Sequence, residues 1–345
     1  MDRSFWNGKS VLVTGHSGFV GSWLCAVLEY CGADTIGFSL KEEPGSLYEK
    51  IGPNLKTECL YGDLRSVDAI QDCIDKVKPD VVFHIAAFGF VKECFEDPGR
   101  AYSSNVQGSL NLFQALKDDG FQGRIIVASS DKVYKNSGKE AYLFTEDDPL
   151  GGSDPYSASK TCEDILAQSY FDSYFTNSRV SLCIVRPSNI LGGGDHNMNR
   201  LIPSIFYNFS NGRKPEIRNP DSVRPWQNIF DMIDAYLTVA ERIDNGLKIY
   251  NVGPEADGIK SVGEICDYVS GLYGQEFDIE KTQLSTVKEK VFLGLAIDKI
   301  KNEIGWSPRR TLEQTLGEIY DFYNNDNGIN TYDLCIKQIK DYYES

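Results

Sequence analysis

The sequence predicts an α/β fold in which a doubly wound parallel sheet is joined to a smaller C-terminal lobe. In the first half of the chain, short apolar runs rich in β-branched residues alternate with stretches of helical periodicity, a pattern typical of βαβ units. A glycine-rich turn stands between the first apolar run and the first helical stretch. At 345 residues, the chain is long enough to form two lobes.

The elements can be followed in order along the chain. The expected strands are residues 10–14, 35–38, 58–61, 81–84, 124–128, 180–185 and 248–252. The expected helices are 19–31, 67–77, 101–116, 156–170 and 228–242, followed in the smaller lobe by 261–272, 297–303 and 312–323. Strands separated by helices of this length form parallel sheets that are buried on both faces. Residues 188–225 are rich in Gly, Asn, Pro and Arg, which indicates loops around a ligand.

The bulk properties exclude several classes of protein. Fifty acidic and 35 basic residues give a net charge of −15, which argues against general binding to nucleic acid or to an anionic membrane. No apolar run approaches the ~18 residues that span a bilayer, and the N-terminus lacks the layout of a signal peptide, so we expect a cytoplasmic protein. Nine scattered cysteines without a CxxC pair, and three histidines, predict no metal site.

The segment VLVTGHSGFVGSWL predicts the dinucleotide-binding turn of a Rossmann domain. Gly15 permits a tight turn, Gly18 lets the backbone approach a pyrophosphate, and Gly21 allows the helix to pack closely on the strand. Free N–H groups and the positive end of the helix then face the anion. The candidate cofactor-binding residues of this turn are Gly15, His16, Ser17, Gly18, Phe19, Val20 and Gly21.

The strand ends that follow favour NAD over NADP. Ser39, Leu40 and Lys41 close the second strand, so there is no arginine for a 2′-phosphate, although an acidic residue for the ribose is missing as well. Asp63, in YGDLR at the end of the third strand, could meet the adenine together with Leu64. It could equally cap the following helix.

Two polar segments carry the candidate chemistry. Ser130, Asp131 and Lys132 follow the fifth strand, at the carboxyl edge where doubly wound sheets place their sites. Tyr156 and Lys160 lie four residues apart, on one face of a helix. A nearby ammonium and a positively charged nicotinamide stabilise a phenolate. We therefore expect the pKa of Tyr156 to fall below its usual value of about 10, so that the residue acts as a base.

Five segments together resemble one protein family. TGHSGFVGSWL, HIAA, SSN, SSDKVY and YSASK occur in the order found in the extended short-chain dehydrogenases/reductases, the NAD-dependent epimerases and dehydratases. The resemblance extends to about residue 323, and RPSNILGGGD and RNPDSVRPWQ look most like the 4,6-dehydratases of CDP-sugars. It adds Ala86, Ala87 and Asn105, with Tyr156 and Lys160, to the expected cofactor-binding residues.

The resemblance implies 4,6-dehydration of a nucleotide sugar, with CDP-glucose favoured and NAD as a cofactor that is regenerated. Tyr156 would remove the proton of the 4-hydroxyl as hydride leaves C4, Ser130 would hold the 4-oxygen, and Lys160 would bind the nicotinamide ribose. Asp131 would protonate the departing 6-hydroxyl, Lys132 would help to remove the C5 proton, and hydride would return to C6. Asp131 must then be protonated and Lys132 neutral, so we expect no tight salt bridge between them.

The nucleotide diphosphate needs cationic donors, for which arginine is suited best. Arg200, Arg218 and Arg224 lie in the segment rich in Gly, Asn and Pro, so they are the candidates. Asn189 and Asn199 could add amide hydrogen bonds to the substrate.

The domain organisation follows from these assignments. We expect residues 1–186, with about 228–252, to form the NAD-binding Rossmann domain. Residues 187–227 and 253–323 would form the nucleotide-sugar-binding lobe, and 324–345 a C-terminal tail. The resemblance also implies a homodimer joined through helices, here those that carry 110–116 and 156–170.

Two other functions stay open. A 4-epimerase or decarboxylase of the same family uses the same oxidation at C4, but a simple epimerase needs no acid at C6, so Asp131 discriminates. A non-catalytic NAD-binding sensor would have no use for Ser130, Tyr156 and Lys160 together. Many relatives have glutamate at the position of Lys132 and a polar residue at the position of Phe88, which leaves the C5 base and the sugar open.

Overall fold

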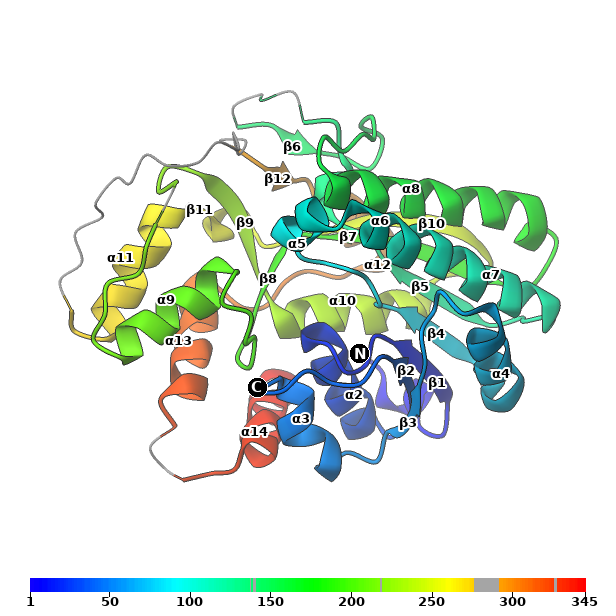
Figure 1. Ribbon diagram of the computed structural model, residues 1–345, viewed down its shortest axis with the longest axis horizontal. Helices are drawn as coiled ribbons and strands as arrows, with labels where there is room; N and C mark the ends of the chain where they lie inside the picture. The colour runs from blue at the N-terminus through cyan, green and yellow to red at the C-terminus, as the bar shows by residue number, and fades with distance from the viewer. Residues whose placement is uncertain (137, 139–140, 218, 276–291, 326–327) are drawn as a thin grey trace.

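The computed structural model describes residues 1–136, 138, 141–217, 219–275, 292–325 and 328–345 (Figure 1). Within these residues, a seven-stranded parallel sheet has the strand order β10-β7-β5-β4-β1-β2-β3. The strands are β1 (Ser10–Thr14), β2 (Asp34–Ser39), β3 (Glu58–Tyr61), β4 (Val81–His84), β5 (Arg124–Ala128), β7 (Ser181–Pro187) and β10 (Gly246–Val252). The order reverses between β1 and β4, as in doubly wound sheets, so the predicted fold class is confirmed.

Helices cover both faces of this sheet. They are α2 (Phe19–Cys31), α10 (Ile229–Arg242) and α14 (Thr331–Tyr343) on one face, and α4 (Val67–Val77), α7 (Gly108–Asp118) and α8 (Pro155–Tyr170) on the other. Val11 and Val13 of β1 enter the first core, and Leu12 between them enters the second. Because successive side chains of a strand point to opposite faces, a strand buried on both sides needs an unbroken apolar run.

The helix expected over 101–116 is interrupted. α6 (Pro98–Tyr102) passes into a π-helical turn at Ser103–Gln107, and α7 begins at Gly108. Asn105 is fully buried within this turn. π turns are frequent at functional sites, and this one bears a candidate cofactor residue.

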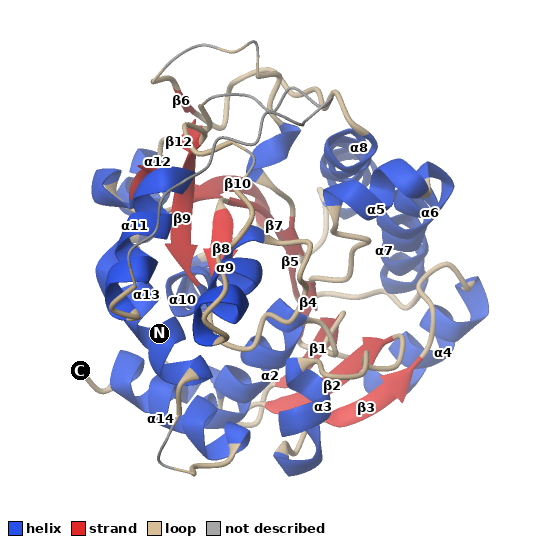
Figure 2. Cartoon of the chain, turned by 60° about the vertical axis from the view of Figure 1, so that its left-hand side comes forward, coloured by secondary structure: helices blue, strands red, loops and turns tan. Residues whose placement is uncertain are grey.

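A smaller lobe follows the carboxyl end of β7. Its elements are β8 (Asn189–Leu191), β9 (Val223–Asn228), β11 (Ile259–Ser261), α9 (Leu201–Ser210), α11 (Val262–Leu272) and α13 (Leu312–Tyr323). They share a core of their own, which includes Trp226, whose Nε1 donates to the carbonyl of Lys260 at 2.8 Å. Figures 1 and 2 both place β8 and β9 between the helices α11 and α13 and the large sheet.

The C-terminal segments differ from the expected division. α12 (Asp298–Ile304), expected in the smaller lobe, packs beside β10 of the large sheet. α14, in the segment expected as a tail, packs against α2 and α3 (Leu47–Ile51). Its residues Cys335, Ile339 and Tyr342 are completely buried, so this helix belongs to the core of the sheet domain.

The remaining elements are short. They are α1 (Arg3–Trp6), α5 (Val91–Glu96), β6 (Leu143–Phe144), β12 (Gly294–Leu295), the 3₁₀ turns Gly52–Asn54, Asp131–Val133 and Ala256–Gly258, and the π turn Phe171–Phe175. In the part of the chain that is described, no helix is both long and apolar enough to cross a bilayer.

Candidate active site

The turn between β1 and α2 fits a pyrophosphate. Gly15 has a φ of +76°, which a residue with a side chain rarely adopts, and a side chain at Gly21 would overlap the carbonyl of Gly15. Gly18 is exposed and precedes α2 without a side-chain cap. Phe19 and Val20 are half-buried in the first helical turn. The backbone N–H groups and the positive end of α2 therefore remain for an anion.

His16 and Ser17 connect this turn to the end of β2. The Ser39 hydroxyl lies 3.0 Å from Nδ1 of His16 and 2.9 Å from Oγ of Ser17, which itself donates to the carbonyl of Leu40 at 3.0 Å. Burial lowers the pKa of His16 to about 4, so its ring is neutral at pH 7. Among the described residues, its buried Nε2 has no hydrogen-bond partner, which leaves this atom for a bound group.

Asp63 and Leu64 lie where the third strand leads into α4. Asp63 accepts hydrogen bonds from the guanidinium of Arg65 at 2.6 Å and from its backbone N–H at 2.9 Å, and these bonds hold the pKa of Asp63 below its usual range. Ser66, and not Asp63, caps α4. The carbonyl of Leu64 accepts from the Asn111 amide at 2.8 Å.

Asn105 holds the loop that follows β4. Its Oδ1 accepts from the backbone N–H of Phe88 at 2.7 Å, and its Nδ2 donates to the Phe88 carbonyl at 3.2 Å and to the Ser159 hydroxyl at 2.9 Å. Ala86 packs directly over the glycine turn, and Ala87 is exposed. The buried amide thus fixes this loop between the glycine turn and α8.

Ser130, Asp131 and Lys132 stand together at the carboxyl end of β5. The Ser130 hydroxyl donates to Oδ1 of Asp131 at 3.2 Å, and Nζ of Lys132 lies 3.3 Å from the same oxygen and 3.2 Å from Oδ1 of Asn189. Asp131 is 1% exposed, and its Oδ2 has no hydrogen-bond partner among the described residues. The expectation that Asp131 and Lys132 avoid a salt bridge is wrong, because the 3₁₀ turn brings them into an ion pair.

Tyr156 faces the same group of residues. Burial raises the pKa of Tyr156 to about 12, and the Asp131 carboxylate acts in the same direction, whereas Ser130 and Arg200 act in the opposite direction. The pKa below 10 expected from the sequence therefore does not arise from the side chains of this chain. A positive nicotinamide in the site would lower it.

The contacts of Lys160 are with residues other than Tyr156. It is 2% exposed, its Nζ donates to the carbonyl of Ala128 at 2.6 Å, and it forms an ion pair with Glu163. Both residues of this ion pair are buried. Glu163 was not among the site residues predicted from the sequence. The three-residue spacing of Lys160 and Glu163 on one helix is a signal that could have found it.

A second buried ion pair was also missed. Asp164 accepts from Nε and Nη2 of Arg186, each at 2.9 Å, and from the Ser129 hydroxyl at 2.7 Å. Arg186 also donates to the hydroxyl of Tyr134 at 3.0 Å. These bonds join the carboxyl ends of β5 and β7 to α8, so Arg186 stabilises the scaffold of the site.

Two of the expected substrate residues lie beside the catalytic candidates. Asn189 contacts Lys132, and Arg200 is close enough to Tyr156 to affect its pKa. Arg200 is paired with Asp195 at 2.9 Å, and its guanidinium lies 4.9 Å from the ring centroid of Phe90.

The other expected substrate residues are less closely associated with this group. Asn199 is exposed in the loop before α9, where its backbone N–H bonds to Asn197. Arg224 is half-buried on β9 and donates to the carbonyl of Val223 at 2.8 Å. Arg218 lies outside the described residues.

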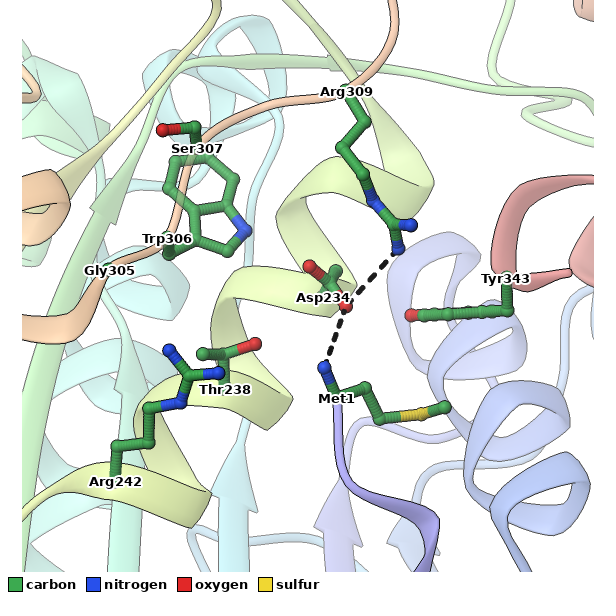
Figure 3. Close-up of a pocket in the computed structure, with 9 residues that line it drawn as sticks. All are labelled: Met1, Asp234, Thr238, Arg242, Gly305, Trp306, Ser307, Arg309 and Tyr343. Atoms are coloured by element: carbon green, nitrogen blue, oxygen red, sulfur yellow. Dashed lines mark ion pairs between the residues drawn. The ribbon is translucent and has the colours of Figure 1, made fainter. Parts of the chain in front are cut away.

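A cavity of about 270 Å³ lies elsewhere in the molecule (Figure 3). Asp234 and Arg242 of α10 line it, together with Trp306 and Arg309. Arg124, the first residue of β5, donates to the carbonyl groups near the end of α10, so this cavity lies toward the amino edge of the sheet. It is separate from the candidate site at the carboxyl edge. No described cluster of His, Cys, Asp or Glu side chains is arranged to hold a metal ion.

Residues 11–253 match the sequence profile of the NAD dependent epimerase/dehydratase family. The chain belongs to this family. It is therefore an NAD-dependent enzyme, and the glycine turn, the orphaned Nε2 of His16 and the buried Lys160 are consistent with a bound NAD.

Relatives within the family extend over nearly the whole chain. The chain is 36% identical to CDP-glucose 4,6-dehydratase of Salmonella typhimurium over 329 residues, covering 92% of this chain and 91% of that protein. The dTDP-glucose 4,6-dehydratase of Bacillus anthracis, solved in complex with NAD, is 26% identical with a TM-score of 0.79, covering 92% and 97%. UDP-glucose 4-epimerase of Thermotoga maritima, at 20% identity and a TM-score of 0.80 over 91% and 98%, shares the fold.

Proposed function

We propose that this enzyme is a nucleotide-sugar 4,6-dehydratase and that its substrate is a CDP-hexose, with glucose as the sugar. The observation that carries the proposal is the Asp131–Lys132 pair beside Ser130 and Tyr156. Oxidation at C4 requires only a base such as Tyr156, whereas elimination of water also requires an acid at C6 and a base at C5. The 36% identity to a CDP-glucose 4,6-dehydratase supports the choice of reaction and nucleotide.

The residues divide the reaction between them. Bound NAD would accept the hydride of C4 and return it to C6. Tyr156 accepts the proton of the 4-hydroxyl, Ser130 donates a hydrogen bond to the 4-oxygen, and Lys160 binds the nicotinamide ribose. The positions of Ser130 and Tyr156 beside one another support their action on the same oxygen.

The Asp131–Lys132 ion pair can supply both groups that elimination needs. Transfer of one proton across the 3.3 Å contact converts ammonium and carboxylate into an amine and a carboxylic acid. The acid then protonates the departing 6-hydroxyl, which leaves as water, while the amine takes the C5 proton. The pair is then charged again, and its ammonium can return the proton to C5 when hydride adds at C6.

Arg200 is the donor that we propose for the substrate diphosphate. It stands at the start of α9, and its aromatic neighbour Phe90 fixes the guanidinium plane. Asp195 occupies one of its donors and would have to share it with the substrate. Phe88, whose backbone is held by Asn105, lies in the same loop as Phe90 and is a candidate for contact with the sugar.

We also propose a homodimer joined through α7 and α8. On α8, Cys162 and Ile165 are exposed and Leu166 is half-buried, at the spacing of one helix face. Tyr174, just beyond α8, is 55% exposed. A second copy of this chain would cover these apolar side chains.

The test is incubation of the purified protein, without added cofactor, with CDP-glucose and with dTDP-, GDP- and UDP-hexoses. Loss of one water from the CDP sugar alone, measured by mass, is the expected result. A new sugar stereoisomer of unchanged mass would instead identify an epimerase. Absence of any reaction, also with added NAD, would overturn the dehydratase proposal.

A further inference from the structure

Glu163 is a completely buried carboxylate for which the proposed reaction has no use. It lies one helical turn beyond Lys160 on α8 and forms an ion pair with that ammonium. Besides its pairing with Glu163, the ammonium donates a hydrogen bond to the carbonyl of Ala128 at 2.6 Å. An ammonium buried at 2% exposure with only a carbonyl would be costly, because burial disfavours the charged form.

Glu163 is itself held from two further elements of the scaffold, the helix α7 and the strand β4. The Ser109 hydroxyl on α7 lies 3.2 Å from Oε1 of Glu163, and Nε2 of His84 at the end of β4 lies 3.5 Å from it. The other ring nitrogen of His84 is 2.8 Å from the hydroxyl of Thr14, at the end of β1. This chain of contacts links the carboxylate to the strand that leads into the glycine turn.

The other ionisable groups near the pair do not replace Glu163. Burial, and then Lys160, lower the pKa of His84 to about 3, so His84 is neutral. Asp164 is turned toward Arg186 and Ser129. Burial raises the pKa of Tyr156 to about 12, so at neutral pH it brings no charge to the pair in this structure.

Among the described residues, one more ionisable neighbour of the Lys160–Glu163 pair lies on α10, a helix that covers the other face of the sheet. Tyr236 on α10 is buried, and its pKa is raised by burial and by the proximity of Tyr156, so it is also neutral. Glu163 is thus the carboxylate that the described structure offers to Lys160.

We propose that Glu163 is a positioning residue that keeps Lys160 protonated and directed to the carboxyl end of β5, where NAD binds. The inference rests on the proposed role of Lys160 toward the nicotinamide ribose. It adds that this role depends on a carboxylate buried behind the lysine, away from cofactor and substrate.

Glu163→Gln tests the charge while keeping an oxygen that can accept from Lys160. Without the carboxylate, Lys160 should lose its proton at a lower pH, so its contribution to NAD binding should fade as the pH rises. We expect the variant to bind NAD within about threefold of the parent enzyme at pH 6 and at least about tenfold more weakly at pH 9. The parent enzyme should keep its affinity across this range.

Isothermal titration calorimetry provides the measurement, with NAD added, in the absence of sugar, to protein from which retained NAD has been removed. Ser109→Ala is the matched control, because it removes another partner of Glu163 and leaves the ion pair, so its NAD affinity should not depend on pH. Equal affinity of Glu163→Gln and the parent enzyme at pH 9, or an equal loss at pH 6 and pH 9, would overturn the proposal. Since no turnover is measured, failure of the dehydratase assay would leave this result unaffected.

A second variant covers the case in which Glu163→Gln does not fold. Lys160→Met/Glu163→Gln leaves neither charge buried, so circular dichroism should show a folded protein with a higher melting temperature than Glu163→Gln. A double variant as unstable as Glu163→Gln would overturn the pairing. A folded double variant supports it, because the defect of the single variant is then the unpaired ammonium.

Discussion

Residues of the two lobes shift the pKa of Tyr156 in opposite directions. Burial and Asp131, on the sheet side, raise the pKa of Tyr156, and Arg200, from the smaller lobe, lowers it. A phenol with a pKa of about 12 is almost wholly protonated at pH 7. Besides its proposed binding of the diphosphate, Arg200 therefore favours the ionised form of Tyr156, the form that would accept the proton.

Arg200→Met should move the acid limb of the pH–kcat profile to higher pH. Activity rises with pH as Tyr156 ionises, and loss of the positive charge makes that ionisation harder. Arg213→Met, which removes an exposed arginine just beyond α9, is the control and should leave the profile in place. If the acid limb of Arg200→Met stays in place or moves to lower pH, Arg200 does not lower the pKa of Tyr156 in the working enzyme.

Asp131→Asn should separate oxidation from elimination. The amide cannot protonate the 6-hydroxyl, so dehydration should fall by at least about 10²-fold. Oxidation at C4 should persist, visible as sugar-dependent absorbance of the reduced cofactor. Unchanged release of water from Asp131→Asn would refute the role of Asp131.

Lys132→Met should slow the exchange of the C5 proton with deuterated solvent. The methionine cannot take up the proton, whereas Tyr156 and Ser130 are unchanged. Lys135→Met, at an exposed lysine three residues later, is the matched control and should exchange like the parent enzyme. Parent-like exchange in Lys132→Met would assign the C5 base to another residue.

At the scale of elements, the helix α8 presents two faces of different character. Tyr156, Lys160, Glu163 and Asp164 face the sheet side or the site, and Cys162 and Ile165 face outward. The separation follows from the 3.6-residue period of the helix. Formation of the proposed dimer would consequently stiffen the helix that carries Tyr156.

Ile165→Glu should convert the proposed dimer into a monomer. A carboxylate placed in an apolar interface loses its hydration without gaining a partner, which should weaken association by at least about tenfold. Tyr207→Glu makes a comparable change at a residue of α9 that is 49% exposed, and should leave the oligomer intact. Light scattering after size exclusion gives the mass. A monomeric parent enzyme, or a dimeric Ile165→Glu, would contradict the proposed interface.

At the scale of the molecule, the chain passes repeatedly between the two lobes. β7 leads into β8, β9 into α10 and β10 into β11, so elements of both cores alternate along the sequence. Trp23 lies in the core of the large sheet and Trp226 in that of the smaller lobe. Such interleaving favours a single cooperative unfolding of both parts.

NAD should therefore stabilise both lobes by the same amount. At a concentration of 100 times its Kd, NAD should add about 2.7 kcal/mol to the free energy of unfolding. Denaturant titrations of the parent enzyme and of Trp226→Phe, which removes the tryptophan of the smaller lobe's core and keeps Trp6, Trp23 and Trp306 in the core of the large sheet, should show the same single fluorescence midpoint, shifted equally by NAD. Two midpoints, with NAD shifting only one, would indicate that the lobes unfold independently.

The local features of the sequence determined the layered architecture. Apolar runs of β-branched residues and the spacing of Gly15, Gly18 and Gly21 depend on contacts between near neighbours, and they predicted every strand of the large sheet. The place of Ser130 followed from the rule that parallel strands end at a common edge, and Tyr156 was indicated by its four-residue spacing from Lys160 and by the family resemblance. The assigned catalytic roles remain predictions.

Only the tertiary structure decided the electrostatics of the site and the place of the C-terminal helix. The Asp131–Lys132 pair, the carboxylate behind Lys160 and the influence of Arg200 on Tyr156 depend on burial and on side chains brought together from distant segments. The packing of α14 into the core was not predicted, because its sequence is polar overall and its apolar stripe is narrow. This stripe becomes part of the core only where α14 packs against α2. The periodicity of a sequence shows which face of a helix or strand is apolar. Interactions between charges depend instead on their distance and on the local dielectric constant, and neither can be read from the order of residues in the chain.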